Sequence, residues 1–280
     1  MKRLLTVWLL FSSVASAQFG LDRLKDKITG KAKPATDRLD RAMETFTPWT
    51  AEEEQEIGRA SAEKMVAMFG LLNAPGIQRY VNLVGGAVAR TAPRELPWRF
   101  GVLDTEIVGA YALPGGYVFI TKGALRSMTN EAQLAGALGH EVQHAAARHL
   151  ESEIRARKTS AWASEEALSK TKEGPQLVRL RADAVLKDLF QTSLSRSKEE
   201  EADLAGTRMA AECGYAGNGL LEFLQILVTE NENPANRRLF GQLLATHPSF
   251  EERIARLSND ASEMRKGKTL EVRFARTLGR

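Results

Sequence analysis

Apolar residues recur at helical spacing through most of the chain, and this pattern gives way to short β-rich runs in one interval. The β-rich runs are expected at residues 98–104, 106–113 and 116–121, with Pro97 and a Pro-Gly-Gly turn as punctuation. Helical patterns are expected at residues 50–70, 77–90, 130–153, 176–190, 198–213, 219–230, 234–245 and 250–257. Helices before and after a small sheet predict a mostly helical α+β domain.

The N-terminus has a different pattern. A short basic start precedes an almost unbroken apolar run at residues 4–14, and Ala15-Ser16-Ala17 has the small-x-small form that signal peptidase cleaves. The apolar run is shorter than the roughly twenty residues that span a bilayer. We therefore expect a signal peptide at 1–17, cleavage near Ala17 and a periplasmic or secreted protein. The alternative is a buried N-terminal helix.

The segment after this signal is charged, with apolar residues at loosely helical spacing. Residues 18–47 are expected to form a linker or an amphipathic helix, which could lie on a membrane surface. Thr50 and Glu53 then have the spacing of a capping box, which predicts the start of the first helix of the folded domain.

Composition excludes several classes of protein. The chain has 280 residues, of which 43% are hydrophobic and 26% charged, as is typical of a globular protein. Its formal net charge is +4, and the excess lies at the two ends, so no basic domain for nucleic acid is predicted. Cys213 is the only cysteine, which excludes an internal disulfide and a zinc site built from cysteines.

Candidate chemistry lies in the helix expected at 130–153. His140-Glu141-Val142-Gln143-His144 is an HExxH motif in a chain with only four histidines. Histidines at i and i+4 project from one helix face, close enough to bind one metal ion. Glu141 is then placed to take a proton from metal-activated water. The alternative is a surface helix with two incidental histidines.

A catalytic zinc site needs a third protein ligand. The three-histidine pattern fails, because no Gly and His follow His144 at the required spacing. A carboxylate from a later helix remains, and the acidic run at 195–203 is the obvious source. Glu199 and Asp203 lie four residues apart on one helix face, so one could bind the metal while the other orients a ligand histidine. Taken alone, an acidic run is usually a solvated helix face.

Several further motifs occur in a fixed order around these residues. They are Glu56-Ile57-Gly58, Tyr80-Val81-Asn82-Leu83-Val84-Gly85, Ala110-Tyr111-Ala112-Leu113-Pro114-Gly115-Gly116, Leu134-Ala135-Gly136-Ala137-Leu138-Gly139 running into the HExxH motif, Arg148-His149, Ser195-Arg196 to Asp203, and His247-Pro248 to Arg253-Ile254. With these motifs, residues 46–257 resemble the gluzincin zinc metallopeptidases of the HtpX, OMA-type and BepA-like group.

This resemblance implies a zincin-like domain with a small β-sheet packed on the active-site helix and one Zn²⁺ per chain. It implies that His140, His144 and Glu199 bind the zinc, with Glu199 preferred over the two glutamates that follow it. Asp203 would orient a ligand histidine from outside. Glu141 would activate water and then pass the proton to the leaving amine.

The resemblance also implies substrate binding by strand addition. An extended polypeptide would pair with an edge strand at 117–121 through main-chain hydrogen bonds, which suits unfolded or misassembled proteins. The residues expected to carry this pairing are Gly116, Tyr117, Val118 and Phe119. Gly109 departs from the family pattern, which often has Asn there, so substrate positioning is expected to differ. No C-terminal tetratricopeptide repeats are expected, because the sequence ends at Arg280.

Two histidines and an arginine remain to be placed. On a continuous helix His149 would face about 140° away from His144, so it is expected to be a structural hydrogen bonder rather than a ligand. His247 is either a histidine at a helix terminus or a fourth zinc ligand that displaces the catalytic water and holds the enzyme latent. Arg253 is a candidate to stabilise the tetrahedral oxyanion by its charge.

The sequence therefore predicts a secreted or periplasmic zinc metalloendopeptidase that hydrolyses peptide bonds in unfolded or misassembled proteins, in quality control of a bacterial envelope. The alternative is a zinc-containing, chaperone-like protein that holds extended segments by strand addition and seldom cuts. The expected division is a signal peptide at 1–17, a linker or amphipathic helix at 18–47, a metallopeptidase domain at 48–260 and a basic tail at 261–280. Polypeptides are the expected partners, and any membrane contact is expected through residues 18–47 or the tail.

Overall fold

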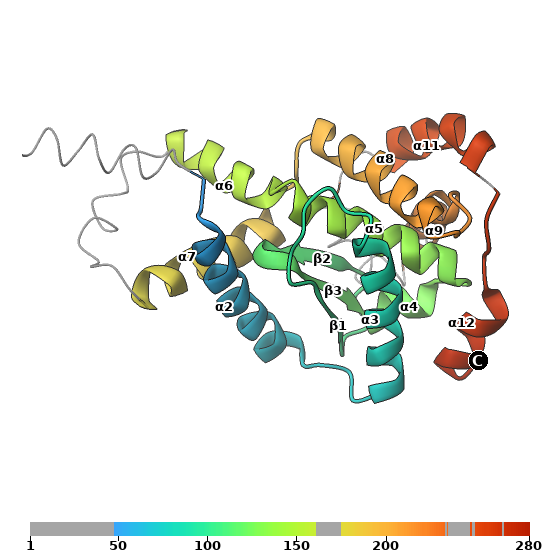
Figure 1. Ribbon diagram of the computed structural model, residues 1–280, viewed down its shortest axis with the longest axis horizontal. Coiled ribbons are helices and arrows are strands. Elements are labelled where there is room, and N and C mark those ends of the chain that lie inside the picture. The colour runs from blue at the N-terminus through green and yellow to red at the C-terminus, as the bar shows by residue number, and fades with distance from the viewer. Residues whose placement is uncertain (1–47, 161–174, 233, 235–246, 248–249, 265) are drawn as a thin grey trace, which may run out of the picture. The chain divides into compact units, whose positions relative to one another are not determined.

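The computed structural model describes residues 48–160, 175–232, 234, 247, 250–264 and 266–280. The expected signal peptide at 1–17, the linker at 18–47 and nearly all of the helix expected at 234–245 lie outside these ranges. The remaining expected elements occur in the described part of the chain in the expected order (Figure 1). No described helix is long and apolar enough to cross a membrane.

Most of the described α-helices lie close to their expected positions, but those at residues 122–127 and 271–278 were not predicted. They are α2 (Ala51–Phe69), α3 (Pro75–Ala89), α4 (Lys122–Ser127), α5 (Glu131–Ala146), α6 (His149–Ser160), α7 (Pro175–Gln191), α8 (Arg196–Glu212), α9 (Gly219–Glu232), α11 (Phe250–Met264) and α12 (Glu271–Leu278). The capping box of α2 is confirmed. The Glu53 backbone N–H donates to Thr50 Oγ1 at 3.2 Å, and the Thr50 backbone N–H donates to Glu53 Oε2 at 2.9 Å.

The sheet has three short strands, with the last strand in the middle. In space the order is β1 (Arg99–Leu103), β3 (Tyr117–Thr121) and β2 (Ala110–Leu113). β3 pairs in parallel with β1 and antiparallel with β2. Among the described residues, β1 and β2 are therefore the edge strands.

This order overturns the expected substrate strand. Tyr117, Val118 and Phe119 each pair with a residue of β1, and each also pairs with a residue of β2. Gly116 lies in the turn that precedes β3. The prediction that residues 117–121 form an edge strand open to substrate is wrong, because both backbone edges of that strand are already paired.

The turn between β2 and β3 requires its glycines. The segment Pro114–Gly116 forms one turn of 3₁₀-helix, in which Gly115 and Gly116 have φ of +73° and +84°. Residues with a side chain rarely adopt these angles. The Gly115 N–H donates to Oε1 of the buried Glu54 at 3.2 Å, which fixes the turn against α2.

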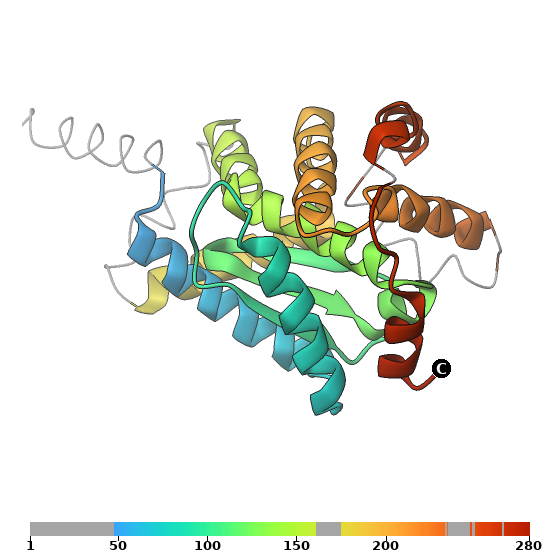
Figure 2. The same cartoon turned by 45° about the vertical axis from the view of Figure 1, so that its right-hand side comes forward.

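Helix α5 is the centre of the domain, and every one of its residues is buried. It packs against β2 and against helices α3, α8 and α9 (Figure 2). A Cβ atom on Gly139 would lie 2.6 Å from the carbonyl oxygen of Gly206, and one on Gly206 would lie 2.4 Å from the backbone nitrogen of His140. The two glycines therefore let the backbones of α5 and α8 meet, and this contact brings the acidic run of α8 to the histidines.

The helix expected over 130–153 is interrupted. α5 ends at Ala146 and α6 begins at His149, because Arg148 has a left-handed φ of +54°. Three contacts hold its side chain: Nη2 lies 2.7 Å from Glu54 Oε2, while Nη1 donates to the carbonyl oxygen of Trp49 at 2.9 Å and lies 3.4 Å from Glu151 Oε2. The chain consequently changes direction directly after the HExxH motif.

The described part of the expected basic tail is folded onto the domain. Lys268 forms a β-bridge with Tyr215, and α12 buries Phe274 in the main hydrophobic core. Arg273 of α12 pairs with the buried Glu131 at the start of α5. Residues 266–280 thus belong to the same compact unit as the helices before them.

Candidate metal centre

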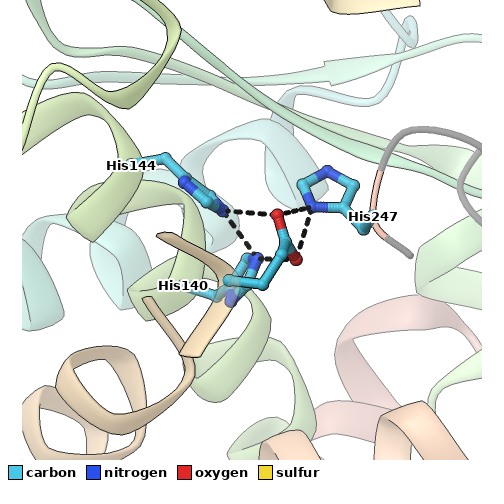
Figure 3. A group of neighbouring side chains, drawn as sticks. His140, His144 and His247 are labelled. Carbon is cyan, nitrogen blue, oxygen red and sulfur yellow. Dashed lines mark hydrogen bonds and ion pairs between the residues drawn. The ribbon is translucent and has the colours of Figure 1, made fainter. Parts of the chain in front are cut away.

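Four side chains converge beside the crossing of α5 and α8 (Figure 3). His140 and His144 come from α5, Glu199 comes from α8, and His247 lies between α9 and α11. All four are buried, and one ligand atom of each lies within 4.8 Å of the other three.

The distances within this cluster fit ligands around a shared ion. The two Nε2 atoms of His140 and His144 are 2.9 Å apart, and the Glu199 oxygens lie 3.7 Å and 3.5 Å from them. Bonds from zinc to nitrogen and oxygen are about 2 Å, so tetrahedral ligand atoms are roughly 3.3 Å apart. Two histidines and one carboxylate are also a common donor set for catalytic zinc. The residues present therefore fit a metal ion.

Each histidine of α5 is held by its second ring nitrogen. Nδ1 of His140 lies 3.0 Å from Asp203 Oδ1, and Nδ1 of His144 lies 2.8 Å from Nδ1 of His149. In both rings Nε2 is then the nitrogen available to a metal. Burial lowers the pKa of His144 well below 6.5, and this keeps its imidazole neutral, the form that binds metals.

Arg253 of α11 joins the two carboxylates of α8. Its Nε and Nη2 donate to Asp203 at 2.8 Å and 2.6 Å, and its Nη1 lies 3.0 Å from Glu199 Oε2. Burial alone raises the pKa of both carboxyl groups. The hydrogen bond from His140 and the charge of Arg253 outweigh burial and lower the pKa of Asp203, while His247, His140 and Arg253 lower that of Glu199 to about 2. Both groups are therefore ionised at neutral pH.

His247 faces Glu199 directly. Its Nδ1 lies 3.1 Å from each carboxylate oxygen of Glu199. Burial lowers the pKa of His247, but the charge of Glu199 and its hydrogen bond outweigh burial, so that the pKa is raised overall. An imidazolium paired with Glu199 is thus favoured, and it must lose its proton before this ring can bind a metal.

Glu141 lies between two pockets that open beside the histidines. The first has an apolar wall, and it is lined by Ala110, Ala137, His140, Glu141, Leu220, Phe223, Leu224, Leu227, His247, Phe250 and Arg253. The second is lined by Ala112, Glu141, His144, Leu150, Leu189, Thr192, Leu194 and His247. The edge strand β2 contributes Ala110 to one pocket and Ala112 to the other. Burial raises the pKa of the Glu141 carboxyl, which favours its use in proton transfer.

The structure brings most of the predicted site residues together. His140, His144, Glu199 and His247 share the cluster, and Asp203 takes the outer position expected for it. Of the other two glutamates, Glu200 pairs with Arg256, and Glu201 accepts a hydrogen bond from Gln143. Arg253 lies among the same residues, with every nitrogen against a carboxylate, and its expected role toward an oxyanion stays a prediction.

The sequence predicts a hydrogen bond from His149, but not its contact with His144. His149 is a hydrogen bonder, as expected, but it lies on the same side as His144 rather than facing away from it. The 140° separation assumed a continuous helix, whereas the break at Arg148 returns His149 to the histidine face. The only local signal was the Arg148-His149 pair that follows the motif in the sequence.

An HExxH helix, a later helix with Glu199 and Asp203, and a small sheet alongside define a metallopeptidase-type domain. The chain belongs to peptidase family M48, whose family profile matches residues 73–261.

Curated relatives agree with this assignment. The beta-barrel assembly-enhancing protease of Escherichia coli K12 is 26% identical over 239 residues, which are 81% of this chain and 48% of that protein. The mitochondrial metalloendopeptidase OMA1 of Arabidopsis thaliana is 28% identical over 245 residues, 79% of this chain and 48% of that protein. OMA1 of Danio rerio is 30% identical over 61% of this chain and 37% of its own length. The chain thus spans about half the length, or less, of these relatives.

Proposed function

We propose that this chain is a zinc-dependent metalloendopeptidase that cleaves unfolded or misassembled polypeptides in quality control of a bacterial envelope. One arrangement carries the proposal: the buried Glu141 lies beside a donor set of two histidines and a glutamate, with a pocket on either side of it. A site that only stored metal would have no use for Glu141. Membership of a metallopeptidase family supports the same reading.

The chain's own residues supply the proton transfers of peptide hydrolysis. A zinc ion held by His140, His144 and Glu199 would supply Lewis-acid polarisation of the scissile carbonyl. Glu141 takes the proton of the attacking water and delivers it to the nitrogen of the leaving amine. Its raised pKa suits this double role, because the carboxyl group must accept and release a proton within one cycle.

Strand β2 is the element that we propose for binding the substrate backbone. Among the described residues it pairs only with β3, so its other backbone edge has no strand partner. Ala110 and Ala112 place this strand beside both pockets. A polypeptide added along β2 would cross Glu141 in an extended conformation and present side chains to a pocket on each side. The apolar wall of the first pocket favours apolar side chains, which unfolded proteins expose.

The proposed location is the periplasm or another secreted space, reached after cleavage of residues 1–17. The basic start, apolar run and Ala-Ser-Ala site of the sequence support it. A relative named as a beta-barrel assembly-enhancing protease supports a role in envelope protein assembly. Fractionation of cells that express the full chain tests this. A processed protein in the periplasm is expected, and an unprocessed cytoplasmic protein would contradict the assignment.

The alternative function, a zinc-containing protein that holds extended segments, is favoured by one observation. His247 lies within 4.8 Å of all three expected ligands. As a fourth ligand it would close the site and leave no position for water. We propose that this closure is a latent state of the peptidase rather than evidence for a holding protein, because Glu141 is present.

Degradation of casein by the zinc-loaded mature chain tests the peptidase. We expect cleavage by the wild type, loss of at least about a hundredfold in Glu141→Gln, since general acid–base groups contribute about 10²–10⁴-fold, and loss on chelation. Zinc content and circular dichroism of Glu141→Gln should match the wild type. Cleavage that persists in Glu141→Gln would contradict the proposed mechanism.

His247→Ala separates latency from holding. If His247 closes the site, this variant should cleave casein faster than the wild type and lose zinc to a chelator more readily. A variant with unchanged cleavage and unchanged zinc retention would contradict the latent state. An inactive wild type and an inactive His247→Ala that both retain zinc and bind unfolded protein would favour the holding function.

A further inference from the structure

A second pair of histidines is in direct contact beside the candidate ligands. His149 is 4% exposed, and its Nδ1 lies 2.8 Å from Nδ1 of His144. Its other ring nitrogen, Nε2, lies 3.5 Å from Oε2 of Glu201 on α8. The opposite oxygen of Glu201 accepts a hydrogen bond from Gln143 Nε2 at 2.8 Å. Three side chains thus form a line that runs from His144 outward to Glu201.

This contact depends on an unfavourable backbone conformation. A left-handed φ at a residue other than glycine costs roughly 1–2 kcal/mol. Arg148 adopts it with φ of +54°, and Glu54 and the Trp49 carbonyl oxygen hold its side chain in place. Without this turn, His149 would lie on the far side of a continuous helix. The fold therefore sustains a local cost whose direct result is the contact between His149 and His144.

Metal binding by His144 determines which ring nitrogens carry protons along this line of side chains. His144 must offer the lone pair of Nε2 to a metal, so its proton is on Nδ1 and is donated to His149. His149 then accepts through Nδ1 and carries its own proton on Nε2, where Glu201 faces it. Gln143 donates to the second oxygen of Glu201 and holds that carboxylate in place.

We propose that His149, oriented by Glu201, is a positioning residue that fixes His144 in the tautomer and ring orientation needed to bind the metal. The inference rests on the metal centre of the proposed function. It gives the two ligand histidines unlike supports: His140 has the anionic Asp203, whereas His144 has a neutral imidazole with a carboxylate one step further out. Outer partners of this kind are typically worth 10–100-fold in metal affinity.

The test measures zinc affinity by competition with a chromogenic chelator, with wild type, His149→Leu and His149→Asn. The Asn side-chain oxygen can take the place of Nδ1 as acceptor, whereas Leu has no acceptor. We expect His149→Leu to bind zinc about 10–100-fold more weakly and His149→Asn to recover most of that loss. The visible spectrum of the cobalt-loaded protein should shift in His149→Leu and return toward the wild type in His149→Asn.

A matched pair on α8 tests the outer end of the line. Glu201→Gln and Glu200→Gln remove the same charge at adjacent positions, but only Glu201 faces His149, whereas Glu200 pairs with Arg256. We expect weaker zinc binding in Glu201→Gln than in Glu200→Gln, and a smaller loss than in His149→Leu. This pair keeps the test informative if His149→Leu fails to fold.

Three results would overturn the inference: wild-type affinity in a folded His149→Leu, equal losses in the Leu and Asn variants, or equal affinities in the two α8 variants. Failure of the metal centre itself would look different. In that case the wild type would not bind zinc, and a Glu199→Ala control would be indistinguishable from it.

Discussion

Near each end of helix α5, a buried carboxylate is paired with an arginine. Only one of these two regions has the features of a chemical site. At its N-terminal end, Glu131 is fully buried and accepts from Tyr80 at 2.6 Å, from Tyr215 at 2.7 Å and from Arg273 Nε at 2.6 Å, with a second close contact from Arg273 Nη2. Every one of these groups donates to the carboxylate, so its two oxygens are satisfied.

The other region has the opposite balance. Glu199 also meets an arginine, Arg253, but its remaining neighbours are imidazole nitrogens at 3.1 to 3.7 Å. The two facing nitrogens of His140 and His144 both have lone pairs available, because their other nitrogens are held from outside. The two Nε2 lone pairs therefore converge with the Glu199 oxygens on one point.

Burial and ion pairing alone therefore do not distinguish a site from a structural contact. A buried carboxylate surrounded by donors stabilises the fold, as at Glu131. A buried carboxylate that also faces the lone pairs of two neutral imidazoles, as at Glu199, offers a set of acceptors to a cation. The region around Glu199 is completed by a bound cation, whereas the region around Glu131 is complete without one, so changes in the two regions should separate metal binding from stability.

The largest effect should follow Glu199→Ala. Loss of a direct ligand should lower zinc affinity on the order of a thousandfold, beyond the 10–100-fold that outer partners are worth, and abolish casein cleavage. Zinc titration and a casein assay check this. The metal-free variant should stay folded by circular dichroism, because Arg253 keeps its two hydrogen bonds to Asp203. Retained zinc affinity would remove Glu199 from the site.

The reverse pattern is expected for Glu131→Gln. The amide cannot accept four donors with the strength of a carboxylate, and removal of one partner of a buried pair costs about 3–5 kcal/mol. We expect the lower end, about 3 kcal/mol, because the Arg273 side chain is 48% exposed. Urea unfolding checks the stability. Zinc affinity of the folded variant should match the wild type, and a parallel loss of metal would show that the two ends of α5 are coupled.

The placement of the site residues on the faces of single helices could be predicted from the sequence. The spacing of His140 and His144 places both on one face of α5, and the spacing of Glu199 and Asp203 does the same on α8. The helices themselves follow from apolar periodicity, which is a local property. Their meeting at Gly139 and Gly206 is not local, and the resemblance to a family supplied that step.

Features set by tertiary contacts were missed. The order of the strands depends on which segments pair in space, and a five-residue run such as 117–121 does not reveal whether one or both of its edges are used. Arg148 has no preference for a positive φ, and the contacts that its side chain makes in this turn include those with Glu54 and Trp49, which are distant in the sequence. In the tail, Phe274 is the one fully buried apolar residue of a short basic helix, too weak a pattern to predict docking.

The two arginines allow a matched and smaller test. Both use a planar fork to hold a carboxylate, but Arg253 is 2% exposed and Arg273 is about half exposed. Lysine keeps the charge and loses the fork. Arg253→Lys should cost about 2 kcal/mol of stability and weaken zinc binding, since a buried partner is lost, whereas Arg273→Lys should cost below about 1 kcal/mol, because this side chain reaches solvent and lysine keeps the charge beside Glu131. Thermal unfolding with and without zinc checks both, and equal costs would contradict the role of burial.

The smallest expected effect is the pH dependence of stability that the carboxyl group of Glu131 causes. Burial raises the pKa of its carboxyl group, but the hydrogen bonds from Arg273, Tyr80 and Tyr215 outweigh burial and bring the pKa below the ordinary 4.5. A carboxyl group whose pKa is lower in the folded state adds stability above its unfolded pKa and loses that contribution as pH falls through the folded value.

The stability difference between wild type and Glu131→Gln should therefore be constant near neutral pH and shrink as the pH falls below 4.5. Urea unfolding in the presence of a chelator checks this without interference from metal binding.

Glu151 is a control for which the opposite pH dependence is expected. Burial raises the pKa of its carboxyl group, so the folded state binds that proton more readily than the unfolded chain does. Its ionised form costs stability at neutral pH, and this cost disappears as pH falls through the raised pKa. The stability of Glu151→Gln relative to the wild type should consequently be highest at neutral pH. If the stability differences of the two variants changed with pH in the same direction, general charge rather than these two environments would govern the acid response.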